Sequence, residues 1–127
     1  MIFKDPRFKA QFEGCPKALQ NIATYLDARM LIECGRPLVI TRVTDPVAGE
    51  SGVHPDGRAF DGRIETGDGF YIPLGKAYAL RDEINARWVR DDEFQCCLIH
   101  SFNGGMIHFH CQIPSEWFDY SKVKMQA

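Results

Sequence analysis

The sequence lacks the features that mark membrane, exported and nucleic-acid-binding proteins. No apolar run approaches the roughly 20 residues that span a bilayer, and residues 1–8 lack the apolar core of a signal peptide. The net charge is −2 without a basic stripe, so nucleic acid is not an expected partner. No repeat or linker divides the 127 residues, which we expect to form one monomeric domain made in the cytoplasm.

The cysteines match neither a disulfide framework nor a thiolate zinc site. Their number, five, is odd, and no Cys-x-x-Cys pair is present. Cys96 and Cys97 are adjacent, and in a strand their side chains would point to opposite faces. We therefore expect buried free thiols and folding in a reducing compartment.

Apolar periodicity predicts an α+β fold. An apolar stripe at helical spacing predicts a helix from Pro16 to Gly35, and a second helix is expected from Pro73 through Arg90. Residues 1–15 are expected to be irregular. Strands are expected over residues 37–44, 58–64, 94–101 and 106–113, with a hairpin turn at Asn103-Gly104 between the last two.

Histidine and aspartate are concentrated in two motifs far apart in the chain. The first is His54-Pro55-Asp56-Gly57-Arg58-Ala59-Phe60-Asp61 and the second is His108-Phe109-His110. Imidazoles and a carboxylate from both motifs could converge on one metal ion. Three protein ligands of this type would leave a fourth position for water, which is typical of a catalytic zinc site.

Strand and turn geometry allows this convergence. His108 and His110 are two apart in a predicted strand and share a face, roughly 6–7 Å apart. His54 and Asp61 are seven apart, which would place them on opposite faces of one regular strand. The turn-forming Pro55-Asp56-Gly57 removes this conflict, because His54 then lies in a loop and Asp61 on the next strand. The remaining histidine, His100, fits no motif and is expected to be structural.

The first motif with the late His-x-His resembles a family of zinc peptidases. This family includes D-alanyl-D-alanine carboxypeptidases, L-alanyl-D-glutamate endolysins and the hedgehog-type domain, and the resemblance covers roughly residues 16 to 113. It implies a hedgehog/DD-peptidase-like antiparallel sheet with helices on one side and a zinc cleft. It also implies that His54, Asp61 and His110 bind Zn²⁺, and that His108 beside the metal assists the reaction.

The resemblance also implies a substrate and a substrate-binding residue. Arg42, on the strand before the first motif, matches the family's arginine that holds the substrate or its developing oxyanion. The implied activity is hydrolysis of an amide bond in peptidoglycan stem peptides, of the carboxypeptidase or endolysin type. Without a signal peptide the protein would reach the cell wall only on release, as a phage lysis protein does with a holin.

One departure from the family leaves the activity open. Members carry an acidic residue as general base close before the last histidine, and Ile107 stands there instead. The base would then be His108, water alone or a carboxylate from elsewhere in the chain. The alternative is a non-catalytic zinc-binding domain of the same fold, either a cell-wall-binding module or a virion structural module that uses zinc only for folding.

Overall fold

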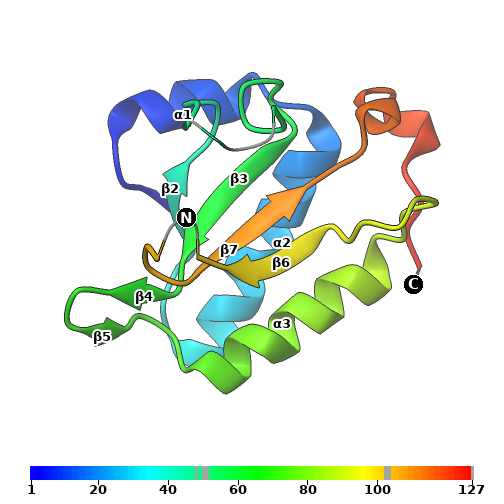
Figure 1. The fold of residues 1–127 in the computed structure, drawn as a ribbon. Coiled ribbons are helices and arrows are strands. Elements are labelled where there is room, and N and C mark those ends of the chain that lie inside the picture. Colours follow the sequence, from blue (N-terminus) through cyan, green and yellow to red (C-terminus); the bar gives the residue numbers. More distant parts are fainter. Residues whose placement is uncertain (48, 50–51, 102–103, 127) are drawn as a thin grey trace.

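The computed structural model describes residues 1–47, 49, 52–101 and 104–126. In this part of the chain it has mixed α+β structure (Figure 1). The helices are α1 (Pro6–Glu13), α2 (Lys17–Cys34) and α3 (Leu74–Arg87), followed by two short 3₁₀ helices, η1 (Ser115–Phe118) and η2 (Tyr120–Lys122). The strands are β1 (Ile2–Phe3), β2 (Val39–Arg42), β3 (Ala59–Arg63), β4 (Glu65–Thr66), β5 (Gly69–Phe70), β6 (Cys97–His100) and β7 (His108–Gln112).

Five strands form the main sheet in the order β1-β2-β3-β7-β6, and β4 and β5 form a separate hairpin. Strands β2, β3, β7 and β6 pair antiparallel, whereas β1 pairs parallel to β2. The expectation of a purely antiparallel sheet was therefore wrong at one edge. Two residues at the N-terminus are enough for this pairing, since Ile2 and Lys4 each donate a backbone hydrogen bond to the chain at β2.

The sheet has one apolar face, and the helices cover it. Phe60, Phe109 and Ile40 on this face are fully buried, together with apolar side chains of α2 and α3. Helix α2 lies behind the sheet and α3 runs along β6 (Figure 1). Gly62 permits close packing here, because a Cβ atom at this position would lie 2.8 Å from Leu38 Cδ1. The opposite face is left for polar side chains.

The N-terminal segment is where the expectation of irregular structure was wrong. Asp5 caps α1 by accepting a hydrogen bond from the Arg7 amide, and Pro6 occupies the first helical position. Phe8 and Phe12 are buried, and the Phe12 ring meets Phe60 edge-on with the centroids 6.3 Å apart. The eight-residue helix is thus held by tertiary packing, because so short a helix is marginal by itself.

The two longer helices and the four antiparallel strands of the main sheet lie where the sequence predicts them, although the strands are shorter. Helix α2 ends at Cys34 and is capped by Gly35, whose φ of 68° is the left-handed conformation that favours glycine at this position. Helix α3 ends at Arg87 rather than Arg90. Asn103, on which the predicted hairpin turn depends, lies outside the described residues.

The cysteine prediction is largely confirmed. Cys15, Cys96, Cys97 and Cys111 are buried, Cys34 is half-buried, and all five are free thiols. Cys111 lies in the apolar core, on the face of β7 opposite His110. Among the described residues, no helix combines the length and the apolar character that crossing a membrane requires.

Candidate metal centre

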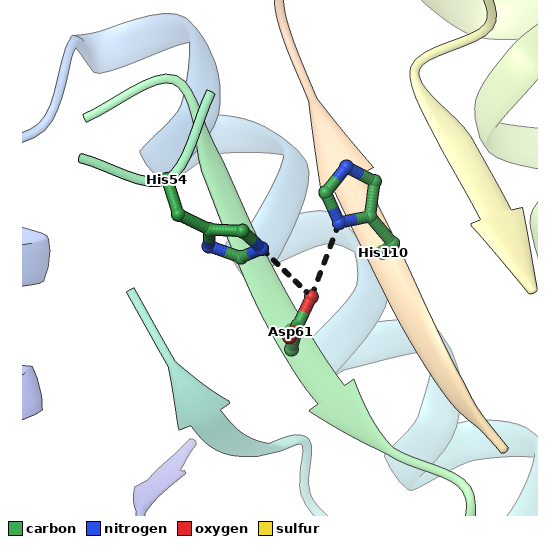
Figure 2. Close-up of side chains that lie close together, drawn as sticks. All are labelled: His54, Asp61 and His110. Atoms are coloured by element: carbon green, nitrogen blue, oxygen red, sulfur yellow. Dashed lines mark hydrogen bonds and ion pairs between the residues drawn. The ribbon is translucent and has the colours of Figure 1, made fainter. Parts of the chain in front are cut away.

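The polar face of the sheet brings the two histidine motifs together. Asp61 on β3 pairs directly with His110 on β7, so their side chains share a face, and His108 pairs with Arg63 on the same face. His54 reaches Asp61 from the loop before β3 (Figure 2). Asp61 Oδ1 lies 3.2 Å from both His54 Nε2 and His110 Nδ1. The three side chains expected to bind metal therefore point toward one another.

A tight turn places His54 over the sheet. The Gly57 amide donates to the His54 carbonyl at 2.9 Å, and Gly57 adopts a left-handed φ of 75°. The Arg58 amide closes the loop by donating to the Val53 carbonyl at 2.9 Å. His54 is thereby held in a loop with only 2 % of its surface exposed. The turn predicted at Pro55-Asp56-Gly57 is what lets His54 and Asp61 meet.

The outer nitrogen of His54 is fixed by the backbone. His54 Nδ1 lies 2.7 Å from the Val43 carbonyl, which can only accept a hydrogen bond, so Nδ1 carries the proton. In the neutral ring Nε2 then presents a lone pair toward Asp61. Among the described residues this buried nitrogen has no hydrogen-bond partner. A buried lone pair facing a carboxylate is an unfavourable arrangement that a cation between them would correct.

Helix α1 contributes to this arrangement, although it carries none of the predicted site residues. Gln11 accepts a hydrogen bond from the Thr44 amide at 3.1 Å and donates one to Asp45 at 2.9 Å. These bonds fasten the chain directly after Val43, whose carbonyl holds His54.

His110 also has both ring nitrogens engaged. Nδ1 faces Asp61, while Nε2 lies 3.1 Å from Gln112 Oε1. The side-chain amide nitrogen of Gln112, Nε2, in turn donates a hydrogen bond to the backbone carbonyl of Gln95 at 3.2 Å. His110 has 6 % of its surface exposed and Gln112 9 %, so this chain of contacts is largely removed from water.

The donor atoms fit a small metal ion. The three ligand atoms of His54, Asp61 and His110 all lie within 4.8 Å of one another. Donors around a tetrahedral zinc ion at about 2.1 Å are separated by roughly 3.4 Å, close to the 3.2 Å found here for the two contacts of Asp61. Two imidazoles and one carboxylate suit Zn²⁺ and leave a fourth position open. The residues therefore fit the ion.

Asp61 is held as a carboxylate. Burial by itself would raise its pKa, but the hydrogen bond with His110 and the positive charge that His54 and His108 carry when protonated hold the pKa of Asp61 well below its ordinary value. Arg42 Nε donates to Oδ2 at 3.1 Å. That contact engages one oxygen and leaves Oδ1 directed at the two imidazoles. Arg42 therefore lies on the site face, as its strand position predicts.

His108 lies beside the three converging residues without joining them. Its Nδ1 is 2.9 Å from the Met106 carbonyl, and its Nε2 is 3.7 Å from Asp61 Oδ2. His100 lies closer to the site than expected from its sequence. Its ring centroid is 4.9 Å from that of His108 and 5.1 Å from that of His110. It shares their face because His100 pairs with His108 across β6 and β7.

A cleft of about 350 Å³ opens next to the site. Asp61, Arg42 and His108 line it, so the cleft and the candidate metal centre share residues. Among the described residues, the cleft is also lined by Lys4, Thr41, Val47, Arg63, Glu65, Gly105, Met106 and Ile107. Its walls carry basic groups from three segments of the chain, with an apolar side formed around Met106.

Sequence reasoning missed the groups that surround the candidate ligands. The Val43 carbonyl, the Gln112 amide and His100 carry no recognisable motif. Only the period-two spacing of Gln112 from His110 placed it on the same face. Comparison of the chain with protein-family models, with curated proteins and with solved structures finds no match.

Proposed function

We propose that this protein is a zinc-dependent peptidase of the hedgehog/DD-peptidase type, which hydrolyses an amide bond in peptidoglycan stem peptides. The observation that carries the proposal is the buried convergence of His54 Nε2, Asp61 Oδ1 and His110 Nδ1 beside an open cleft. The resemblance of both motifs to this peptidase family supplies the substrate class. A bound zinc ion would lower the pKa of its water to about 7 and polarise the scissile carbonyl.

The chain's own residues would bind and orient the substrate. The Arg42 guanidinium lines the cleft and would hold a substrate carboxylate or the developing oxyanion through charge-assisted hydrogen bonds. Lys4 and Arg63 line the same cleft. Stem peptides carry carboxylates, so basic walls in a protein with net charge −2 favour such a substrate.

The proton transfer is assigned to His108. The side chain of Ile107 has no acidic group that could act as the base. The backbone amide of Ile107 donates a hydrogen bond to Glu65 Oε1 at 3.1 Å. His108 lines the cleft and has its Nδ1 at the Met106 carbonyl, which leaves Nε2 on the side of Asp61. An imidazole in this place can orient the attacking water and carry a proton to the leaving amine. Glu65 is the second carboxylate among the described residues that line the cleft, which makes it the competing candidate for this role.

The test is digestion of purified peptidoglycan, and of synthetic stem peptides, by the zinc-loaded protein. We expect release of peptide fragments by the wild type. The Asp61→Asn variant should be inactive, and Lys76→Gln, which changes an exposed lysine on α3 outside the cleft, should match the wild type. Cleavage that persists in Asp61→Asn would contradict the proposal.

The replacement of the family's acid by Ile107 favours a second candidate function, a zinc-binding module without turnover. It would bind the cell wall or form part of a virion. Full zinc binding together with intact stem peptides after prolonged incubation would select this alternative. Retention of the protein on peptidoglycan in a sedimentation assay would separate the wall-binding form from the virion form.

A further inference from the structure

Gln112 links the candidate metal centre to the backbone of the segment before β6. Its amide nitrogen donates to the Gln95 carbonyl at 3.2 Å, and its Oε1 lies 3.1 Å from His110 Nε2. Gln112 is 9 % exposed, so water has little access to replace these two hydrogen bonds. Gln112 therefore has one fixed acceptor on one side and one ring nitrogen on the other.

The backbone carbonyl decides which way the Gln112 amide points. A carbonyl can only accept, so the NH₂ group must face Gln95 and the oxygen must face His110. The reversed amide would set two oxygens against each other and would aim an N–H at His110 Nε2. That nitrogen would then have to be the unprotonated one, which moves the ring proton to Nδ1 and blocks the lone pair that faces Asp61.

The same contacts fix the orientation of the His110 ring. Rotating the ring by half a turn would exchange its nitrogens with carbons. Carbon atoms would then face Asp61 Oδ1 and Gln112 Oε1, and both hydrogen bonds would be lost. With the observed orientation, the tautomer whose Nε2–H donates to Gln112 leaves the Nδ1 lone pair for a metal, whose binding would replace the hydrogen bond between Nδ1 and Asp61.

We propose that Gln112 is a positioning residue that makes Nδ1 the metal-binding nitrogen of His110. The inference rests on the metal site of the proposed function and assigns it a residue outside both motifs. Gln112 acts through His110 and has no contact with the metal itself. His54 has the equivalent support from the Val43 carbonyl, so both histidines would be held in the metal-binding tautomer by groups on their outer side.

Three variants test the role of the Gln112 oxygen. Gln112→Met keeps the length of the side chain but removes the acceptor, and we expect zinc affinity to fall about 10–100-fold. Gln112→Glu keeps an acceptor at His110 but sets its second oxygen against the Gln95 carbonyl, so it should lose less zinc affinity than Gln112→Met. Gln95→Ala is the matched control, because Gln95 contributes only its backbone carbonyl. Affinity is measured by competition with a chromophoric chelator after removal of bound metal.

A spectroscopic readout separates positioning from general support of the fold. In the zinc-loaded wild type we expect the ¹⁵N NMR spectrum to show that His110 is protonated at Nε2. We also expect this proton to exchange slowly with the solvent. In Gln112→Met this proton should exchange faster, while circular dichroism of the metal-free protein stays unchanged. Equal zinc affinity in the wild type and Gln112→Met would overturn the inference, as would a proton on Nδ1 of His110 in the zinc-loaded protein.

The outcome for Gln112 can be distinguished from the outcome for the peptidase. If the wild type binds zinc and Gln112→Met loses affinity, the inference holds whether or not stem peptides are cleaved. If stem peptides are cleaved and Gln112→Met binds zinc normally, the inference fails while the proposed activity stands. A wild type that binds no zinc would overturn both.

Discussion

Zinc is expected to raise the melting temperature of the metal-free protein in proportion to the logarithm of its concentration. The three donor atoms of the site are buried and lie within 4.8 Å of one another only in the folded chain. In the unfolded chain 55 residues lie between His54 and His110, so the ion binds the folded state preferentially. Ligand binding of this kind adds free energy to folding by mass action.

The size of the shift follows from that linkage. Zinc at 1,000 times its dissociation constant stabilises the fold by about 4 kcal/mol. A domain of 127 residues gains roughly 3–6 °C in melting temperature per kcal/mol. We therefore expect a shift of roughly 12–25 °C at that concentration and roughly 4–8 °C for each tenfold increase in zinc. Because the ligands must be deprotonated, the shift should shrink as the pH falls.

Thermal unfolding of metal-stripped protein in a zinc titration provides the assay. Asp61→Asn and His110→Ala each remove a ligand and should abolish the shift. His100→Ala is the matched control, since His100 packs against His108 and His110 but is not one of the converging donors. A wild-type melting temperature that does not change with zinc concentration would refute the metal site. An equal loss of the shift in His100→Ala would show that the ligand set is wrong.

Four further results are expected. His108→Ala should keep its zinc and lose about 10²–10⁴-fold in turnover of stem peptides; unchanged turnover, with loss in Glu65→Gln, would move the base to Glu65. Arg42→Ala should also keep zinc and lose about 10²–10³-fold in turnover, as removal of one oxyanion donor does, and wild-type rates would remove its assigned role. Burial raises the pKa of Cys15 to about 11 and that of Cys96 to about 12, so mass spectrometry after alkylation at pH 8 should find only the half-buried Cys34 modified in the folded protein; rapid labelling of Cys96 would contradict its burial. The pKa of Asp61 lies well below its unfolded value, so its stabilising contribution is present above about pH 4 and is lost as the pH falls below that value; metal-free wild type should lose stability in this range more steeply than Asp61→Asn in urea unfolding, and parallel curves would refute the assignment.

The parts of the fold that follow from local pattern could be predicted from the sequence. The apolar stripe of α2 and its end at Gly35 are local signals, as is the alternation that defines β3 and β7. The N-terminal segment could not be predicted in the same way. Helix α1 depends on the burial of Phe8 and Phe12, and β1 depends on pairing with a strand more than thirty positions away. Both are decided by tertiary contacts that composition does not encode.

His100 shows the corresponding limit for the site. A two-residue turn at Asn103-Gly104 would pair His100 with Ile107 and turn its side chain to the face opposite His108. The observed register pairs His100 with His108 instead. A slip of one residue moves a side chain to the other face of a sheet. The face on which His100 lies was therefore fixed by strand register, which the sequence pattern left undetermined.

The site divides into a part that motif spacing can find and a part that it cannot. His54, Asp61 and His110 carry their own chemistry, and period-two spacing with one turn is enough to bring them together. The groups that orient them are ordinary, a backbone carbonyl at Val43 and an amide at Gln112. Their effect depends on direction, because each must accept a hydrogen bond from the outer N–H of a ring. Residue type alone does not reveal direction, so in this protein the ligands can be proposed from the sequence while the reason that their lone pairs converge requires the structure.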